Sequence, residues 1–135
     1  MSSSQKTVKI ISFLLFAVAV LFYVVGGVML AGAGSLDDSA RSTAFALSMV
    51  LFFEGLVYIV YAGLGIRGAN NPRKIGPFRV YTVIVLAFGV LNVAVAVASH
   101  PENIIGSAGI STIAALVLAI AGFITSGKVV KELDR

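Results

Sequence analysis

The chain has 135 residues, of which 59% are hydrophobic and only 12% are charged, and its mean hydropathy is +1.02. This composition excludes an ordinary water-soluble domain, which needs more polar residues to cover its surface. The net charge of +4 does not indicate a nucleic-acid partner, because the basic residues are spread over short segments and form no basic module. The composition predicts an integral membrane protein in contact with the lipid bilayer.

Cysteine and histidine, which bind transition metals and redox groups, are nearly missing. The chain has no cysteine and one histidine, His100. Disulfides, thiolate metal sites, a haem held by two histidines and His-rich metal sites are therefore excluded. We expect no metal and no cofactor.

Four apolar stretches are long enough to cross a bilayer, which takes about 20 residues. They cover residues 10–33, 44–66, 80–99 and 104–126, so residues 1–135 are expected to form a single integral membrane domain. The connections are short, which favours antiparallel neighbours. The predicted fold is all-α, a four-transmembrane-helix up-down bundle.

The first stretch, 10–33, follows a basic N-terminus and ends in Ala31-Gly32-Ala33, a sequence of the kind that signal peptidase cleaves. Its apolar run exceeds 20 residues, whereas the apolar region of a signal peptide has about 7–15. We therefore expect a transmembrane helix and not a cleaved leader.

The second stretch contains Glu54, in "LFFEGLVYIV" (51–60), about 11 residues or roughly 16 Å from either end. Tyr58 and Tyr61 follow at spacings of four and seven, on the same helical face. Asn92 of the third stretch lies at a similar depth, whereas no Lys or Arg does. Because an unpaired buried carboxylate is costly, we expect a neutral Glu54 that donates a hydrogen bond to Asn92 or a tyrosine.

Three interpretations of Glu54 are open. It could only join helices by hydrogen bonds, each worth about 0.6–2 kcal/mol in membranes. It could exchange a proton or bind a cation with Asn92, Tyr58 and Tyr61 beside it, since intramembrane carboxylates often do this in transporters and pumps. It could also pair with a basic group on another membrane protein.

The connection between the second and third stretches is basic. It carries Arg67, Arg73, Lys74 and Arg79. Positive charges next to a membrane helix can contact anionic lipid headgroups or an acidic partner, and both contacts are candidates here.

The same connection, "GLGIRGANNPRKIGPF" (63–78), resembles a junction in small bacterial four-helix membrane proteins, where Gly-Ala-x-Asn-Pro-x-Lys precedes the next helix. The matching residues are Gly68, Ala69, Asn71, Pro72 and Lys74. The resemblance implies a four-helix architecture and a bacterial inner-membrane setting. It implies no particular activity.

Small side chains recur along one face of the fourth stretch. They are Ala108, Thr112, Ala115, Ala119 and Gly122. Helices in membranes pack closely through such faces, so we expect a packing surface here. A pore or ligand cleft lined by these residues is the alternative.

Positive charge is strongly unequal between the two sides of the predicted bundle. One side holds Lys6, Lys9, Arg67, Arg73, Lys74, Arg79, Lys128, Lys131 and Arg135, and the other holds only Arg41. The positive-inside rule therefore places both termini in the cytoplasm. The same inequality argues against insertion in both directions, which small multidrug-resistance transporters of similar size use to form antiparallel dimers.

Two functions agree with these features. The first is a non-enzymatic accessory, scaffold or assembly subunit that packs against further copies of itself or another membrane protein. The alternative is a small oligomeric proton- or cation-coupled transporter or channel that uses Glu54. No enzyme activity is expected, because Glu54 has no second carboxylate, histidine or cysteine near it.

Overall fold

The computed structural model describes residues 1–99 and 107–133, with the backbone alone at 95–97, 99 and 107–112. Within this part the chain is helical without any strand, as predicted. The long helices are α1 (Ser3–Gly32), α2 (Asp38–Asn70), α3 (Gly76–Ser99) and α4 (Ser107–Leu133), and the 3-10 turns η1 (Ala33–Ser35) and η2 (Pro72–Lys74) precede α2 and α3. Each long helix contains a segment long and apolar enough to cross a membrane.

The first two helices begin before the apolar stretches 10–33 and 44–66. At the start of α1, the Ser2 hydroxyl accepts a hydrogen bond from the Gln5 N–H at 3.1 Å, and the Ser2 N–H donates to Gln5 Oε1 at 2.9 Å. Asp37 accepts from the Ala40 N–H at 2.8 Å at the start of α2. These polar caps satisfy the first free N–H groups, so each helix continues beyond its apolar part.

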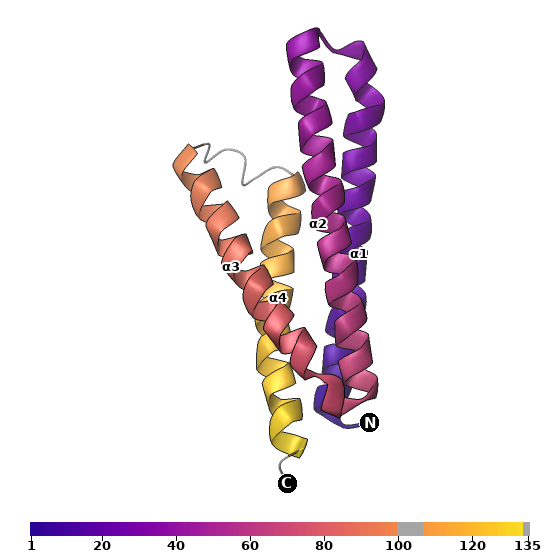
Figure 1. Ribbon diagram of the computed structural model, residues 1–135, viewed down its shortest axis with the longest axis vertical. Helices are drawn as coiled ribbons and strands as arrows, with labels where there is room; N and C mark the ends of the chain where they lie inside the picture. The colour runs from indigo at the N-terminus through magenta and orange to yellow at the C-terminus, as the bar shows by residue number, and fades with distance from the viewer. Residues whose placement is uncertain (100–106, 134–135) are drawn as a thin grey trace.

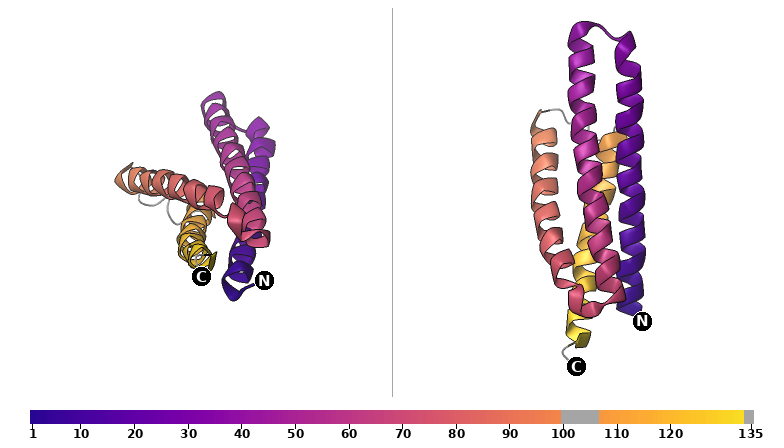
Figure 2. Two further views of the ribbon diagram at one scale, coloured as in Figure 1. Left: turned by 60° about the horizontal axis from the view of Figure 1, so that its bottom comes forward. Right: turned by 45° about the vertical axis from the view of Figure 1, so that its right-hand side comes forward.

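The helices follow one another around the bundle in chain order, and neighbours run antiparallel (Figure 1). α1 packs along α2 and also along α4, whereas α3 packs mainly on α4. α2 and α3 make few contacts, and beyond the end near η2 they diverge in each view (Figure 2). The predicted up-down order is therefore present, but one side of the bundle is open.

Both termini and η2 lie at one end of the bundle (Figure 1). Ser2 Oγ donates to Glu132 Oε2 at 2.7 Å, and Gln5 Nε2 donates to the Ala69 carbonyl at 2.9 Å. These bonds join the start of α1 to the ends of α4 and α2. At the opposite end Arg41 lies 3.7 Å from Asp38.

The core lies mainly between α1, α2 and α4. From α1 it receives side chains at helical spacing: Val8, Ile11, Leu15, Val18, Ala19 and Phe22. Buried hydroxyls are satisfied within their own helix, since Ser12 and Thr82 donate to carbonyls four residues earlier at 2.8 and 2.7 Å. Large apolar side chains are exposed on all four long helices, which agrees with their being apolar enough to cross a membrane.

Two glycines near the end of α2 allow close packing. A Cβ at Gly65 would lie 2.8 Å from the Phe78 ring and would overlap Ser12 Oγ, and a Cβ at Gly68 would lie 3.0 Å from the Ile75 Cα. Gly63 faces open space, with nothing within 4 Å of such a Cβ. Gly65 and Gly68 are therefore packing positions, whereas Gly63 is not.

We expect Gly65→Ala to lower the free energy of unfolding by about 1–3 kcal/mol, because the added methyl must displace Ser12 and the Phe78 ring. Gly63→Ala is the matched control on the same helix and should be neutral or slightly stabilising, since alanine favours helix. Unfolding in detergent, followed by circular dichroism, measures both variants. Equal effects at the two positions would contradict the close packing at Gly65.

Candidate functional site

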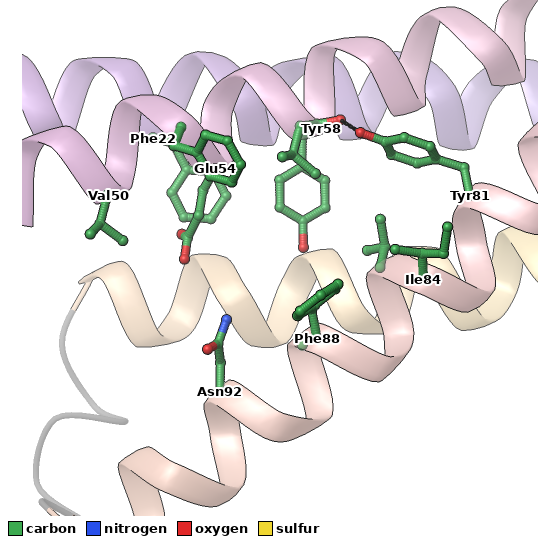
Figure 3. Close-up of a pocket in the computed structure, with 12 residues that line it drawn as sticks. Phe22, Val50, Glu54, Tyr58, Tyr81, Ile84, Phe88 and Asn92 are labelled. Carbon is green, nitrogen blue, oxygen red and sulfur yellow. Dashed lines mark hydrogen bonds between the residues drawn. The ribbon is translucent and has the colours of Figure 1, made fainter.

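The open side of the bundle is a cleft of about 470 Å³ between α2 and α3, with one wall residue from α1 (Figure 3). Five of its lining residues are aromatic: Phe22, Phe53, Tyr58, Tyr81 and Phe88. Glu54 and Asn92 add a carboxyl and an amide, and the others are aliphatic residues and one glycine. A volume of this size, apolar walls and a few polar groups are typical of small-molecule sites.

Glu54 lies at the centre of α2, 16 residues or about 24 Å from either helix end. Its half-buried carboxyl points into the cleft, and Asn92 points toward it from α3 (Figure 3). The expected hydrogen bond from Glu54 to Asn92 or a tyrosine is not present, because α3 leans away from α2 at this height and Tyr58 points its hydroxyl elsewhere into the cleft. Within the described part of the chain, no basic side chain lines the cleft.

Tyr58 lies beside Glu54 in the cleft, as its spacing predicts. Its ring stacks on Phe22 of α1 with 5.5 Å between centroids, and its hydroxyl points into the cleft (Figure 3). Tyr81 forms part of the opposite wall, and its hydroxyl donates to the Val57 carbonyl at 3.1 Å. This bond links α3 to α2 at the narrow end of the cleft.

Tyr61, which is predicted to lie beside Glu54, is not in the cleft. It is completely buried, shares a hydrogen bond with Thr82 at 2.5 Å and stacks on Phe78 with 4.9 Å between centroids. Glu54 and Tyr61 lie on the same face of α2. Near Glu54 this face is open to the cleft, whereas near Tyr61 it is covered by α3. Tyr61 therefore joins α2 and α3 between the cleft and η2.

The candidate lipid or partner contacts fall into two groups. Arg67, Arg73 and Lys74 are exposed at the end of the bundle that holds both termini. Arg79 instead turns toward α4, and its guanidinium carbon lies 4.7 Å from the centre of the Phe123 ring. This cation–π contact makes Arg79 part of the α3–α4 packing.

The small-residue face of α4 is used inside the chain. Ala115 and Ala119 are completely buried, and a Cβ at Gly122 would lie 3.1 Å from the Phe78 ring. The side chains of Ala108 and Thr112 lie outside the described part. Where it is described, this face packs on the chain's own helices and offers no surface to a second protein.

Most of the wall residues, including Phe22, Tyr81 and Phe88, are not identified as site residues from the sequence. Tyr81, Val85, Phe88 and Asn92 recur at spacings of four, three and four, so the helical face of Asn92 could have identified the α3 wall. Phe22 comes from another helix, and no pattern in the sequence places it next to Glu54.

In the part of the chain that the structure describes, the fold and the cleft define an all-helical protein with four helices able to cross a membrane and one carboxyl group in an apolar cleft between α2 and α3. No protein-family model, curated protein or solved structure matches the chain. Function is therefore inferred from the chemistry of the cleft.

Proposed function

We propose that this is a single-domain membrane protein of the bacterial inner membrane with both termini in the cytoplasm. The four apolar helices, the position of both termini at one end and the basic residues at that end support this orientation. The exposed Arg67, Arg73 and Lys74 then lie at the level of anionic cytoplasmic headgroups. The bacterial setting rests on the resemblance of the junction 63–78.

In this proposal the protein is a small, non-enzymatic transporter in which Glu54 exchanges a proton for a cation. The observation that carries it is the Glu54 carboxyl, which points into the cleft at mid-helix without an ion pair within the described chain. An ionised carboxylate in such a place costs several kcal/mol unless it is paired. Without a cation beside it the carboxyl is therefore favoured as the neutral acid; when a cation enters, the carboxyl releases its proton to water and the cation balances the carboxylate.

Toward η2 the cleft ends where the Tyr61–Thr82 and Tyr81–Val57 hydrogen bonds join α2 and α3, so the described part of one chain does not enclose a continuous path. We therefore include further copies of the chain in the proposal, so that the transporter is a homo-oligomer. Intramembrane carboxylates in transporters and pumps commonly face a cavity of this kind.

Chemical labelling tests the proposed role of Glu54. Dicyclohexylcarbodiimide is apolar and adds to protonated carboxyl groups, so it should label Glu54, which mass spectrometry of proteolytic fragments would identify. Cations that enter the cleft should slow the labelling, and Glu54→Gln should remove it. The proposal fails if Glu54 is not labelled, or if no cation changes the rate.

A second candidate is the accessory, scaffold or assembly subunit. The observation that favours it is the exposure of the cleft residues Phe53 (68%) and Phe88 (64%), because a helix of another membrane protein along α2 and α3 would cover them and could bring a basic group to Glu54. A stoichiometric complex that dissociates in Glu54→Gln would favour this candidate. Protection of Glu54 by small cations in the isolated protein would favour transport.

A further inference from the structure

We infer that the cleft between α2 and α3 binds a lipophilic organic cation, an ammonium or phosphonium group with a single charge on an apolar body. The inference rests on the proposed role of Glu54 and adds the chemical class of the substrate.

The charge of the ligand follows from the groups that face Glu54. On α2 itself the titratable neighbour is Tyr58, from α3 it is Tyr81, and α1 contributes the apolar Phe22. No other charged side chain of the described residues lines the cleft. A ligand with one positive charge therefore balances the single negative charge of an ionised Glu54.

The protein oxygen atoms that line the cleft are too few to replace the water shell of a hard metal ion. Ca²⁺ takes six to eight oxygen ligands and Mg²⁺ near-ideal octahedral coordination. The cleft offers the Glu54 carboxyl, the Asn92 amide and the Tyr58 hydroxyl, whereas the Tyr81 hydroxyl is already bonded to the Val57 carbonyl at 3.1 Å. An organic cation needs no such set of ligands.

The walls fit an apolar body and a diffuse positive charge. The stacked rings of Phe22 and Tyr58 form one wall and Phe88 faces them from α3 (Figure 3). The faces of aromatic rings carry negative electrostatic potential and attract ammonium-type cations, while their area buries apolar groups. The volume of about 470 Å³ lies within the range of sites for small organic molecules.

The opening of the cleft points to the same class of ligand. Phe53 of α2 and Phe88 of α3 line the cleft and are 68% and 64% exposed, so the cleft opens to the outside of the bundle at the level of Glu54. If the helices cross a bilayer, that side faces lipid. A ligand that reaches Glu54 by this route has to be soluble in the hydrocarbon region.

Two probes of the same shape and opposite charge test the inference: tetraphenylphosphonium and tetraphenylborate. Binding is measured by equilibrium dialysis to the full chain in nanodiscs of zwitterionic lipid, with empty nanodiscs subtracted. Wild type should bind the cation and not the anion. Glu54→Gln should weaken cation binding by about 30-fold or more, as expected for loss of one partner of a desolvated charge pair. Glu54→Asp, which keeps the charge, should retain part of the affinity.

The outcomes separate this inference from the proposed function. Equal binding of the two probes, or equal cation affinity of wild type and a folded Glu54→Gln, overturns the inference. The inference is also overturned if tetraphenylphosphonium does not bind. If Na⁺ or K⁺ nevertheless slows carbodiimide labelling of Glu54, the proposed function stands. If no cation slows the labelling, both fail. If Glu54→Gln does not fold, the inference is still tested by the binding of the two probes to wild type and by the cation affinity of Glu54→Asp.

Discussion

Phe78→Ala is expected to lower the free energy of unfolding by about 3 kcal/mol or more, the range for truncation of a buried phenylalanine. Phe78 has no exposed surface, stacks on Tyr61 with 4.9 Å between centroids and fills the space beside Gly65 and Gly122. These contacts join α3 to both α2 and α4. Truncation would leave a cavity between three helices, and the two adjacent glycines have no side chains to fill it.

The matched control is Phe13→Ala. Phe13 is 54% exposed on α1, so its ring faces outward, where lipid can replace its contacts. Chemical unfolding in detergent should give nearly the wild-type midpoint for this variant and a clearly lower one for Phe78→Ala. If the two variants lose the same stability, the proposed packing of α3 on α2 and α4 is incorrect.

Ile84→Trp should weaken the binding of tetraphenylphosphonium by at least about tenfold, or about 1.4 kcal/mol, without loss of stability. Ile84 lines the cleft and is 47% exposed, so a larger side chain there can extend into the cleft without displacing the core. Glu54 stays intact in this variant. The result therefore tests where the ligand lies separately from which group balances its charge.

Val83→Trp is the control for added bulk. Val83 precedes Ile84 on α3, is 54% exposed and does not line the cleft. The affinity of the Val83→Trp variant for tetraphenylphosphonium should match that of wild type under the same dialysis conditions. If Ile84→Trp binds as well as Val83→Trp, the ligand does not occupy the cleft.

The sequence was sufficient to predict the number of helices and their antiparallel order, because four apolar stretches separated by short polar segments allow few other arrangements. The helix ends were less accurate. Hydropathy detects only the apolar part of a helix, whereas the caps at Ser2 and Asp37 start α1 and α2 earlier. The open side was not predicted, since it depends on α3 packing against α4 at Gly89 and Leu116.

The candidate site was predicted in part. Depth and spacing along single helices identified Glu54, Tyr58 and Asn92, and all three line one cleft. The same rule failed for Tyr61. Its position seven residues after Glu54 puts it on the same face of α2, but α3 covers that face at its level through Thr82 and Phe78. Helical spacing gives the direction of a side chain and not the distance of the neighbouring helix.

The exchange of a proton for a cation at Glu54 is tested most directly by infrared difference spectroscopy of the protein in lipid. Adding tetraphenylphosphonium to wild type should remove the C=O band of one protonated carboxyl group and produce carboxylate bands, and neither change should occur in Glu54→Gln. If the cation binds while the carboxyl band of wild type stays unchanged, Glu54 does not exchange its proton for the ligand and the account is contradicted.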